Sequence, residues 1–242
     1  MDTDLQLLCQ RGSELLRDTD YIGAESHLAR AESLALAARD FDTLSRLYFP
    51  LQEARRQKRQ RCGEGAVRLD LFGDNLPPPE SLAGFHPHGQ FLLAAHRSTA
   101  PALALRNLHR ERGNYAEVLL AAAIPVAPAG LVIAVLAFHT DLSFLPPLPS
   151  PDHLTRLLPP HTLLLTPAEL SAGNGPGTPA TFARTMALWE RLHLPYLALA
   201  DATTDPESRL AAYRKTTEVD YACELAHQNA AGTARQLARA AQ

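Results

Sequence analysis

Apolar residues recur at two different spacings along this chain, and the change falls near Cys62. Before that point they follow the period of an α-helix, and no strand-like alternation occurs. After it, apolar runs of strand length alternate with segments that carry helix-start signals. Pro50 is the one proline of nineteen that precedes Cys62. The pattern predicts a helical region over residues 1–62 and an α/β domain over residues 63–242.

The helical region is expected to hold three helices. The first two form an antiparallel pair around a break at residues 18–21, and the third covers residues 41–61 with an apolar stripe of its own. Small residues at Gly12, Ala24 and Ala31 would let the first two helices approach closely. Pro50 should kink or split the third helix, because proline removes a backbone hydrogen bond and clashes with the preceding turn.

These small residues resemble the pattern of one tetratricopeptide repeat. The matching positions are Leu8, Gly12 and Leu15 in the first helix and Ala24, Leu28 and Ala31 in the second. The family prefers tryptophan at Leu8, an apolar residue at Arg11 and a closing proline at Leu36. The resemblance implies a docking surface for a peptide or protein partner, and a plain helical hairpin is the alternative. In either case a single repeat must bury its face against a further element.

Residues 63–242 contain six apolar runs of strand length. They are residues 67–71, 91–95, 117–122, 131–138, 162–165 and 196–200. Several are apolar on both sides, which is typical of strands in a parallel sheet between two layers of helices. Capping residues stand directly before proline at positions 151, 167, 179 and 206, where helices are expected to start. The expected fold is a three-layer, Rossmann-like α/β sandwich with a mostly parallel sheet, closed by a long helix over residues 218–239.

Polar residues follow several of the predicted strands, and these are the candidate catalytic residues. They are His96, His139, Asp141 and Asp201. In an open parallel sheet the carboxyl ends of the strands share one edge, where ligands bind, so His96, His139 and Asp201 should emerge together. Histidine and carboxylate side chains could act there as general acids or bases. Strand ends of any α/β protein carry polar residues, which is the alternative explanation.

A glycine-rich segment is the weak candidate for cofactor binding. Gly173, Gly175 and Gly177 stand between a predicted strand and a helix start, where backbone amides could cradle a phosphate. The spacing matches no dinucleotide or phosphate-loop motif, and Pro176 removes one amide donor. A connector is the preferred interpretation, and no cofactor is predicted.

Three histidine pairings have metal-like spacing, and we predict no metal site from them. Pro87 interrupts the pair His86 and His88. Glu190 with His193, and Glu224 with His227, repeat a di-iron spacing outside the four-helix bundle that such sites require. Asp220, Glu224 and His227 fall on one face of the predicted last helix, which leaves a surface or domain-contact cluster open.

Composition limits the remaining possibilities. A net charge of -3 gives no overall attraction to nucleic acid, and the basic run at residues 55–61 is interpreted as a solvated helix end, so we expect no nucleic-acid partner. Three distant cysteines and an acidic start with no signal peptide favour a reducing, cytoplasmic location. The apolar region 118–138 is interrupted by Pro125, Pro128 and Gly130, so no membrane span is predicted.

No motif in the chain names a reaction. Residues 47–55 and 220–228 look like segments of an uncharacterised bacterial repeat-containing family, and that resemblance implies no activity. The leading hypothesis is a binding or scaffold protein, with a helical front joined to an α/β domain that recognises a partner or ligand. The alternative is a small enzyme or nucleotide-binding protein that uses the strand-end residues.

Overall fold

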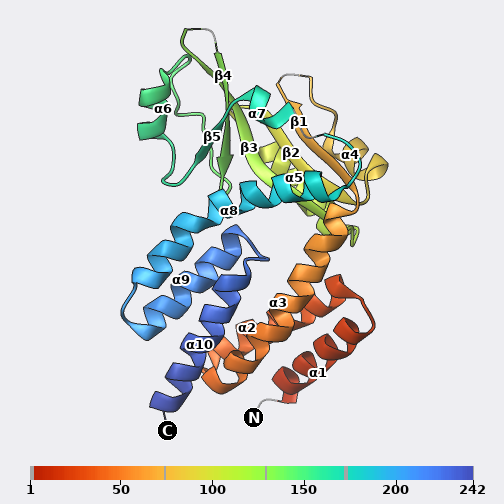
Figure 1. The fold of residues 1–242 in the computed structure, drawn as a ribbon, viewed down its shortest axis with the longest axis vertical. Coiled ribbons are helices and arrows are strands. Elements are labelled where there is room, and N and C mark those ends of the chain that lie inside the picture. The colour runs from red at the N-terminus through yellow and green to blue at the C-terminus, as the bar shows by residue number, and fades with distance from the viewer. Residues whose placement is uncertain (1–2, 74, 129, 172–173, 242) are drawn as a thin grey trace. The chain divides into compact units, whose positions relative to one another are not determined.

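The computed structural model describes residues 3–73, 75–128, 130–171 and 174–241, which contain ten helices and five strands (Figure 1). They divide into two compact units. The helical unit combines Met1–Arg59 with His193–Gln242, and the sheet unit comprises Gln60–Leu192. The sheet unit is therefore inserted into the helical unit. We expected a single boundary near residue 62, with all that follows in one α/β domain; instead the last fifty residues complete the helical unit.

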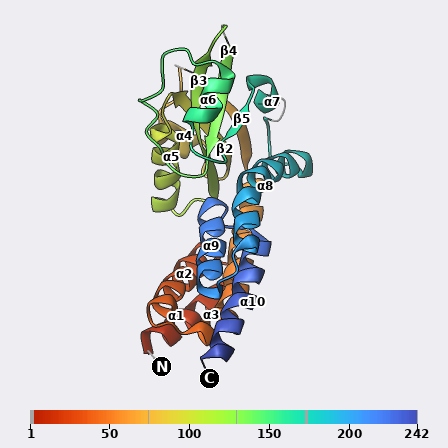
Figure 2. The ribbon, with the colours of Figure 1, turned by 90° about the vertical axis from the view of Figure 1, so that its left-hand side faces the viewer.

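The helical unit is built from six helices. They are α1 (Thr3–Arg17), α2 (Tyr21–Ala37), α3 (Phe41–Gly63), the last part of α8 (Pro179–Ala202), α9 (Pro206–Val219) and α10 (Glu224–Ala240). Helices α9 and α10 run side by side in both views (Figure 1, Figure 2). One apolar core joins all six and includes Leu28, Leu51, Leu197, Leu210 and Ala231.

The amino-terminal helices confirm the expected close pair. Asp20 caps α2 by accepting a hydrogen bond from the Gly23 amide at 2.9 Å. Helix α1 packs on α2 at Gly12, where an added Cβ would lie only 2.6 Å from Cγ of Leu28. A side chain at this position would overpack the contact, because Leu28 or one of the helices would have to move to make room for it.

Two helices contain an internal proline. Helix α3 continues through Pro50, so of the expected kink or split at this residue the split does not occur. Residues 196–200, expected as a strand, lie within α8, which continues through Pro195. Leu197 and Ala200 are three residues apart and both reach the apolar core, so helical packing outweighs the cost of an internal proline.

The sheet unit contains a five-stranded mixed sheet in the order β1-β2-β3-β4-β5. The strands are β1 (Ala66–Phe72), β2 (Gly89–His96), β3 (Ala116–Val126), β4 (Gly130–Leu136) and β5 (Leu163–Leu165). The helices of this unit are α4 (Pro79–Phe85), α5 (Ala100–Glu111), α6 (Pro151–Leu157), α7 (Pro167–Ser171) and the first part of α8. Helices α4 and α5 share an apolar cluster with β1, β2 and β3, and α6 shares one with β3 and β4.

The sheet is parallel only at its start. Strands β1, β2 and β3 are parallel, whereas β4 and β5 are antiparallel to their neighbours. Because β4 begins four residues after β3 ends, the connection is too short for the crossover that a parallel pair needs. The expectation of a mostly parallel sheet was wrong for this reason. The α/β class holds.

Candidate functional site

Two of the predicted strand-end residues come close to the start of α5. Nδ1 of His139 lies 2.7 Å from Oγ1 of Thr99, and Asp141 forms an isolated β-bridge with Ser98. Asp141 accepts hydrogen bonds from the amide and hydroxyl of Ser143, and these bonds lower the pKa of its carboxyl. Thr99 is fully buried, so the contact with His139 anchors the loop that follows β4.

The other two candidates have different surroundings. His96 ends β2, pairs with Ala123 of β3 and is exposed. Asp201 lies on α8, in the helical unit, and accepts a hydrogen bond from the Tyr213 hydroxyl at 2.7 Å. It follows no strand, because the run before it is helical. The proposed shared edge of His96, His139 and Asp201 therefore has no basis in the sheet.

The glycine-rich segment covers the free edge of β1. Gly175 and Val67 exchange two backbone hydrogen bonds, and Oδ1 of Asn174 accepts one from the Leu69 amide at 2.6 Å. At Gly177 an added Cβ would lie 2.2 Å from the Gly63 carbonyl oxygen. Gly173 lies outside the described residues. Gly175 thus serves edge pairing, with its amide already bonded to Val67, and Gly177 serves close packing.

The histidines with metal-like spacing take separate positions. His86 ends α4 beside the ring of Phe91, and His88 lies beside Tyr115. Glu190 and Glu224 are exposed, whereas His227 is buried. Among the described residues, no group of three or more His, Cys, Asp or Glu side chains is arranged to hold a metal ion.

The basic run at the end of α3 is neutralised by carboxylates of the same chain. Arg55 and Lys58 both pair with Glu25 of α2, at 3.2 and 2.5 Å. The remaining pairs are Arg56 with Glu53, Arg59 with Asp220 and Arg61 with Glu64. Part of this run is buried: the Arg59 side chain is only 8% exposed. Sequence reasoning interpreted the run as a solvated helix end, because partners distant in sequence leave no local signal.

Asp220 lies at the centre of a buried polar cluster. It ends α9 and precedes α10, so it does not share a helix face with Glu224 and His227 as expected. Its Oδ1 lies 2.7 Å from Nη2 of Arg59, and its Oδ2 lies 2.6 Å from Nδ1 of His193. His193 also bonds to Cys223. One carboxylate therefore binds two cationic groups from two other helices.

The protonation of this cluster follows from its contacts. Burial works to lower the pKa of His193, but hydrogen bonds to Asp220 and Cys223 outweigh it and raise the pKa to about 9. Burial works to raise the pKa of Asp220, but the charge of Arg59 and the bond to His193 hold it well below its usual range. At neutral pH the pair is therefore a carboxylate and an imidazolium.

His227, on α10 close to this cluster, is neutral at pH 7. Its Nδ1 donates to the Cys223 carbonyl oxygen at 2.8 Å, and its Nε2 accepts from Arg55 at 3.0 Å. Burial and the charge of Arg55 lower its pKa to about 4. At neutral pH His193 is therefore a cation and His227 is neutral. A shared metal site would not explain this difference between the histidines of the two E-x-x-H segments.

A groove runs over the amino-terminal helices. Its volume is about 310 Å³, within the range of ligand pockets. Leu5, Leu28 and Leu47 are buried and form an apolar floor. The remaining lining residues are Gln6, Cys9, Ser13, Thr43, Arg46 and Pro50. Helices α1 and α3 supply all of the lining except Leu28, so the groove is a feature of the helical unit alone.

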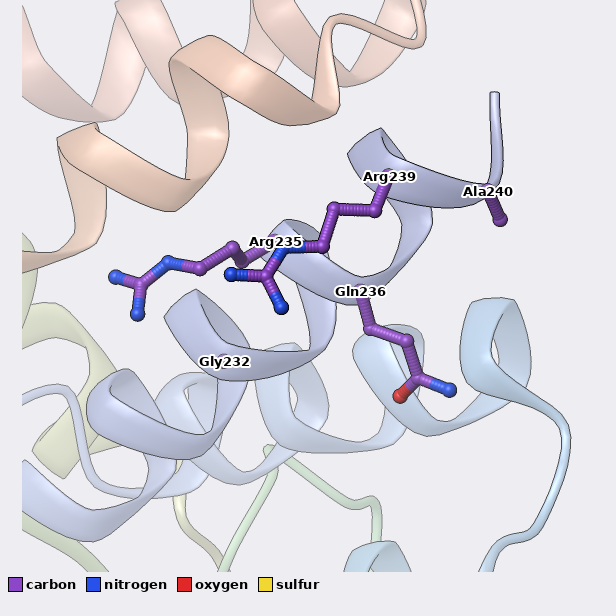
Figure 3. A pocket seen from close by; sticks show the side chains of 5 residues that line it. All are labelled: Gly232, Arg235, Gln236, Arg239 and Ala240. Atoms are coloured by element: carbon purple, nitrogen blue, oxygen red, sulfur yellow. The ribbon is translucent and has the colours of Figure 1, made fainter. Parts of the chain in front are cut away.

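A second hollow, of about 560 Å³, lies along α10. Its lining residues Gly232, Arg235, Gln236, Arg239 and Ala240 all belong to this one helix. Figure 3 shows Arg235 and Arg239 extending to one side and Gln236 to the other. Among the described residues, no second element contributes to its lining, so it is an open helix face rather than a built binding site.

Across the described ranges, none of the helices is both long enough and apolar enough to cross a membrane.

Comparison with known proteins gives no relatives. No family model matches the chain, and neither a curated protein nor a solved structure matches it significantly. The functional argument therefore depends on the geometry of the chain itself.

Proposed function

We propose that this is a binding or scaffold protein whose helical front holds an apolar segment of a protein partner in the groove between α1 and α3. The observation that carries the proposal is the groove itself. Three buried leucines form its floor, and its single charged residue, Arg46, is already paired with Asp42 at 2.6 Å. Burial of aliphatic side chains is therefore the main source of affinity.

The polar residues of the groove favour the same kind of ligand. The Ser13 hydroxyl donates to the Cys9 carbonyl oxygen, and the Thr43 hydroxyl donates to Asp40. These donors are already used, so a ligand gains little from polar contacts with them. The resemblance of α1 and α2 to one tetratricopeptide repeat supports a peptide-binding role, because stacked repeats of this kind form extended binding surfaces.

Cys9 offers a direct test, because it is half-buried in the groove whereas Cys62 and Cys223 are buried. A bulky maleimide adduct on Cys9 should occupy the groove. Peptides selected from a random display library for binding to the full chain should then lose at least tenfold in affinity, measured by fluorescence anisotropy.

The matched control is a Cys9→Ser/Ser33→Cys variant that carries the same adduct on the exposed face of α2. This adduct should leave peptide affinity unchanged. Equal losses from both adducts, or from neither, would place the peptide site outside the groove.

One observation supports the enzyme alternative: the contact between the Thr99 hydroxyl and the His139 imidazole. A hydroxyl beside an imidazole is the arrangement of an activated nucleophile. Because Thr99 is fully buried, a substrate could not reach its hydroxyl without movement of the loop after β4. His139→Ala should leave folding nearly intact, because the Thr99 hydroxyl can still donate to the Thr140 carbonyl oxygen. Loss of a turnover or ligand-binding activity in this variant would favour the alternative over the groove.

A further inference from the structure

The helical unit is assembled from two stretches of chain that are separated by the whole sheet unit. Arg59 is the last residue of the first stretch, and His193 is the first residue of the second. Arg59 lies on α3 and His193 on α8. Both side chains bind Asp220, which lies between α9 and α10. A single carboxylate thus connects the point where the chain leaves this unit with the point where it returns.

The Asp220 carboxylate is held in a fixed position. Its side chain is 2% exposed, and its Oδ1 also accepts a hydrogen bond from the Ala222 amide at 3.1 Å. Its backbone amide donates to the Thr216 carbonyl oxygen, and its own carbonyl oxygen accepts from the Cys223 amide. Because the turn between α9 and α10 fixes the carboxylate, the position of Asp220 determines where Arg59 of α3 and His193 of α8 can bind it.

We propose that Asp220 is a latch that fastens α3 and α8 together at the exit and return points of the chain, and that the proton on His193 controls the hold on α8. We call Arg59, Asp220 and His193 the Asp220 latch. Arg59 stays charged at all accessible pH, so the hold on α3 is permanent. The hold on α8 is strong only while His193 is an imidazolium.

His193 is the titratable cation of the latch, and its contacts come from several elements. His193 faces Asp220 and Cys223, and Asp220 faces Arg59. On the neighbouring helices, Glu25 neutralises Arg55 and Lys58, and His227 is neutral. Lys58 and Arg59 also lie over the Tyr221 ring, at 4.7 and 4.9 Å from its centroid. Because the pKa of His193 is raised to about 9, the latch is closed at neutral pH and opens on the α8 side as the pH rises through that value.

The test follows His193 by NMR and the backbone by hydrogen exchange in the full chain. In the wild type, the His193 ring should titrate near pH 9. Exchange protection of the amides at residues 196–199, corrected for the intrinsic rate, should fall at least tenfold over the same range. In Asp220→Asn, His193 should titrate at or below its ordinary pKa of about 6.5, and protection there should no longer depend on pH between 7 and 10.

Glu25→Gln is the control, because it removes a buried carboxylate that binds Arg55 and Lys58 but not His193. It should leave the His193 titration unchanged. A wild-type titration near pH 6.5, or an unchanged titration in Asp220→Asn, would overturn the proposal.

His193→Gln keeps the test decisive if Asp220→Asn does not fold. Glutamine keeps a hydrogen-bond donor for Asp220 and does not titrate in this range. Exchange at residues 196–199 should then be independent of pH between 7 and 10. A dependence equal to that of the wild type would show that His193 does not control the hold on α8.

Discussion

Single residues set the contacts of the helical unit. Gly12 allows α1 to touch α2, and Asp20 caps α2 at the turn between them. Glu25 holds two cations of α3 against α2. Each of these residues controls a contact between two elements, and each is a place where a small change has a measurable effect on stability.

Gly12→Val should lower the free energy of unfolding by about 1–3 kcal/mol, because its side chain overpacks the contact with Leu28. Urea denaturation of the full chain measures the change. The matched control is Gly232→Ala, in α10, where an added Cβ meets no atom within 4 Å. This variant should stabilise the chain by about 0.5–1 kcal/mol. Equal destabilisation by both variants would contradict a specific helix contact at Gly12.

At the scale of the element, the sequence predicts best where packing is local. The three amino-terminal helices and the first five strands were all found near their expected positions, because their periodicity and caps lie within each segment. The run at residues 196–200 was misread, since Pro195 is a strong local signal and the core that overrides it comes from other helices. The same limit applies to the site. Nothing near Arg59 in the sequence indicates Asp220.

The loop that contains Asn174 and Gly175 supplies hydrogen-bond partners to the outer edge of strand β1. Asn174→Ala should remove the acceptor of the Leu69 amide and raise the hydrogen-exchange rate of that amide at least tenfold. Asn174→Asp keeps an acceptor oxygen and should retain most of the protection. Exchange by NMR or mass spectrometry distinguishes the two. Similar exchange in Asn174→Ala and the wild type would mean that the loop does not protect the edge of β1.

At the scale of the whole molecule, three histidines with shifted pKa values set the pH range of stability. The folded-state pKa of His193 is raised to about 9, so its contribution is fully present below pH 6.5 and is lost as the pH rises to 9. His109 and His227 have pKa values lowered to about 4, mainly by burial. They stay neutral in the folded chain, so stability falls as the pH drops from 6.5 to 4.

The free energy of unfolding should therefore be largest near pH 6.5 and decline on both sides. Urea denaturation between pH 4 and pH 10 measures this profile. His193→Gln should flatten the alkaline side only, and His227→Gln should flatten part of the acid side only. A stability that keeps rising from pH 6.5 to pH 9 would contradict the assigned charge state of His193.

The insertion of the sheet unit also constrains how the chain is made. Residues 60–192 leave the ribosome after α1, α2 and most of α3 but before the second stretch of the helical unit. At roughly 5–20 residues per second, the apolar faces of the first helices wait on the order of ten seconds for α9 and α10. The sheet unit, which is continuous in sequence, can fold during that wait. Translation therefore orders the two units, with the inserted one completed first and the helical unit closed only when its last segment emerges.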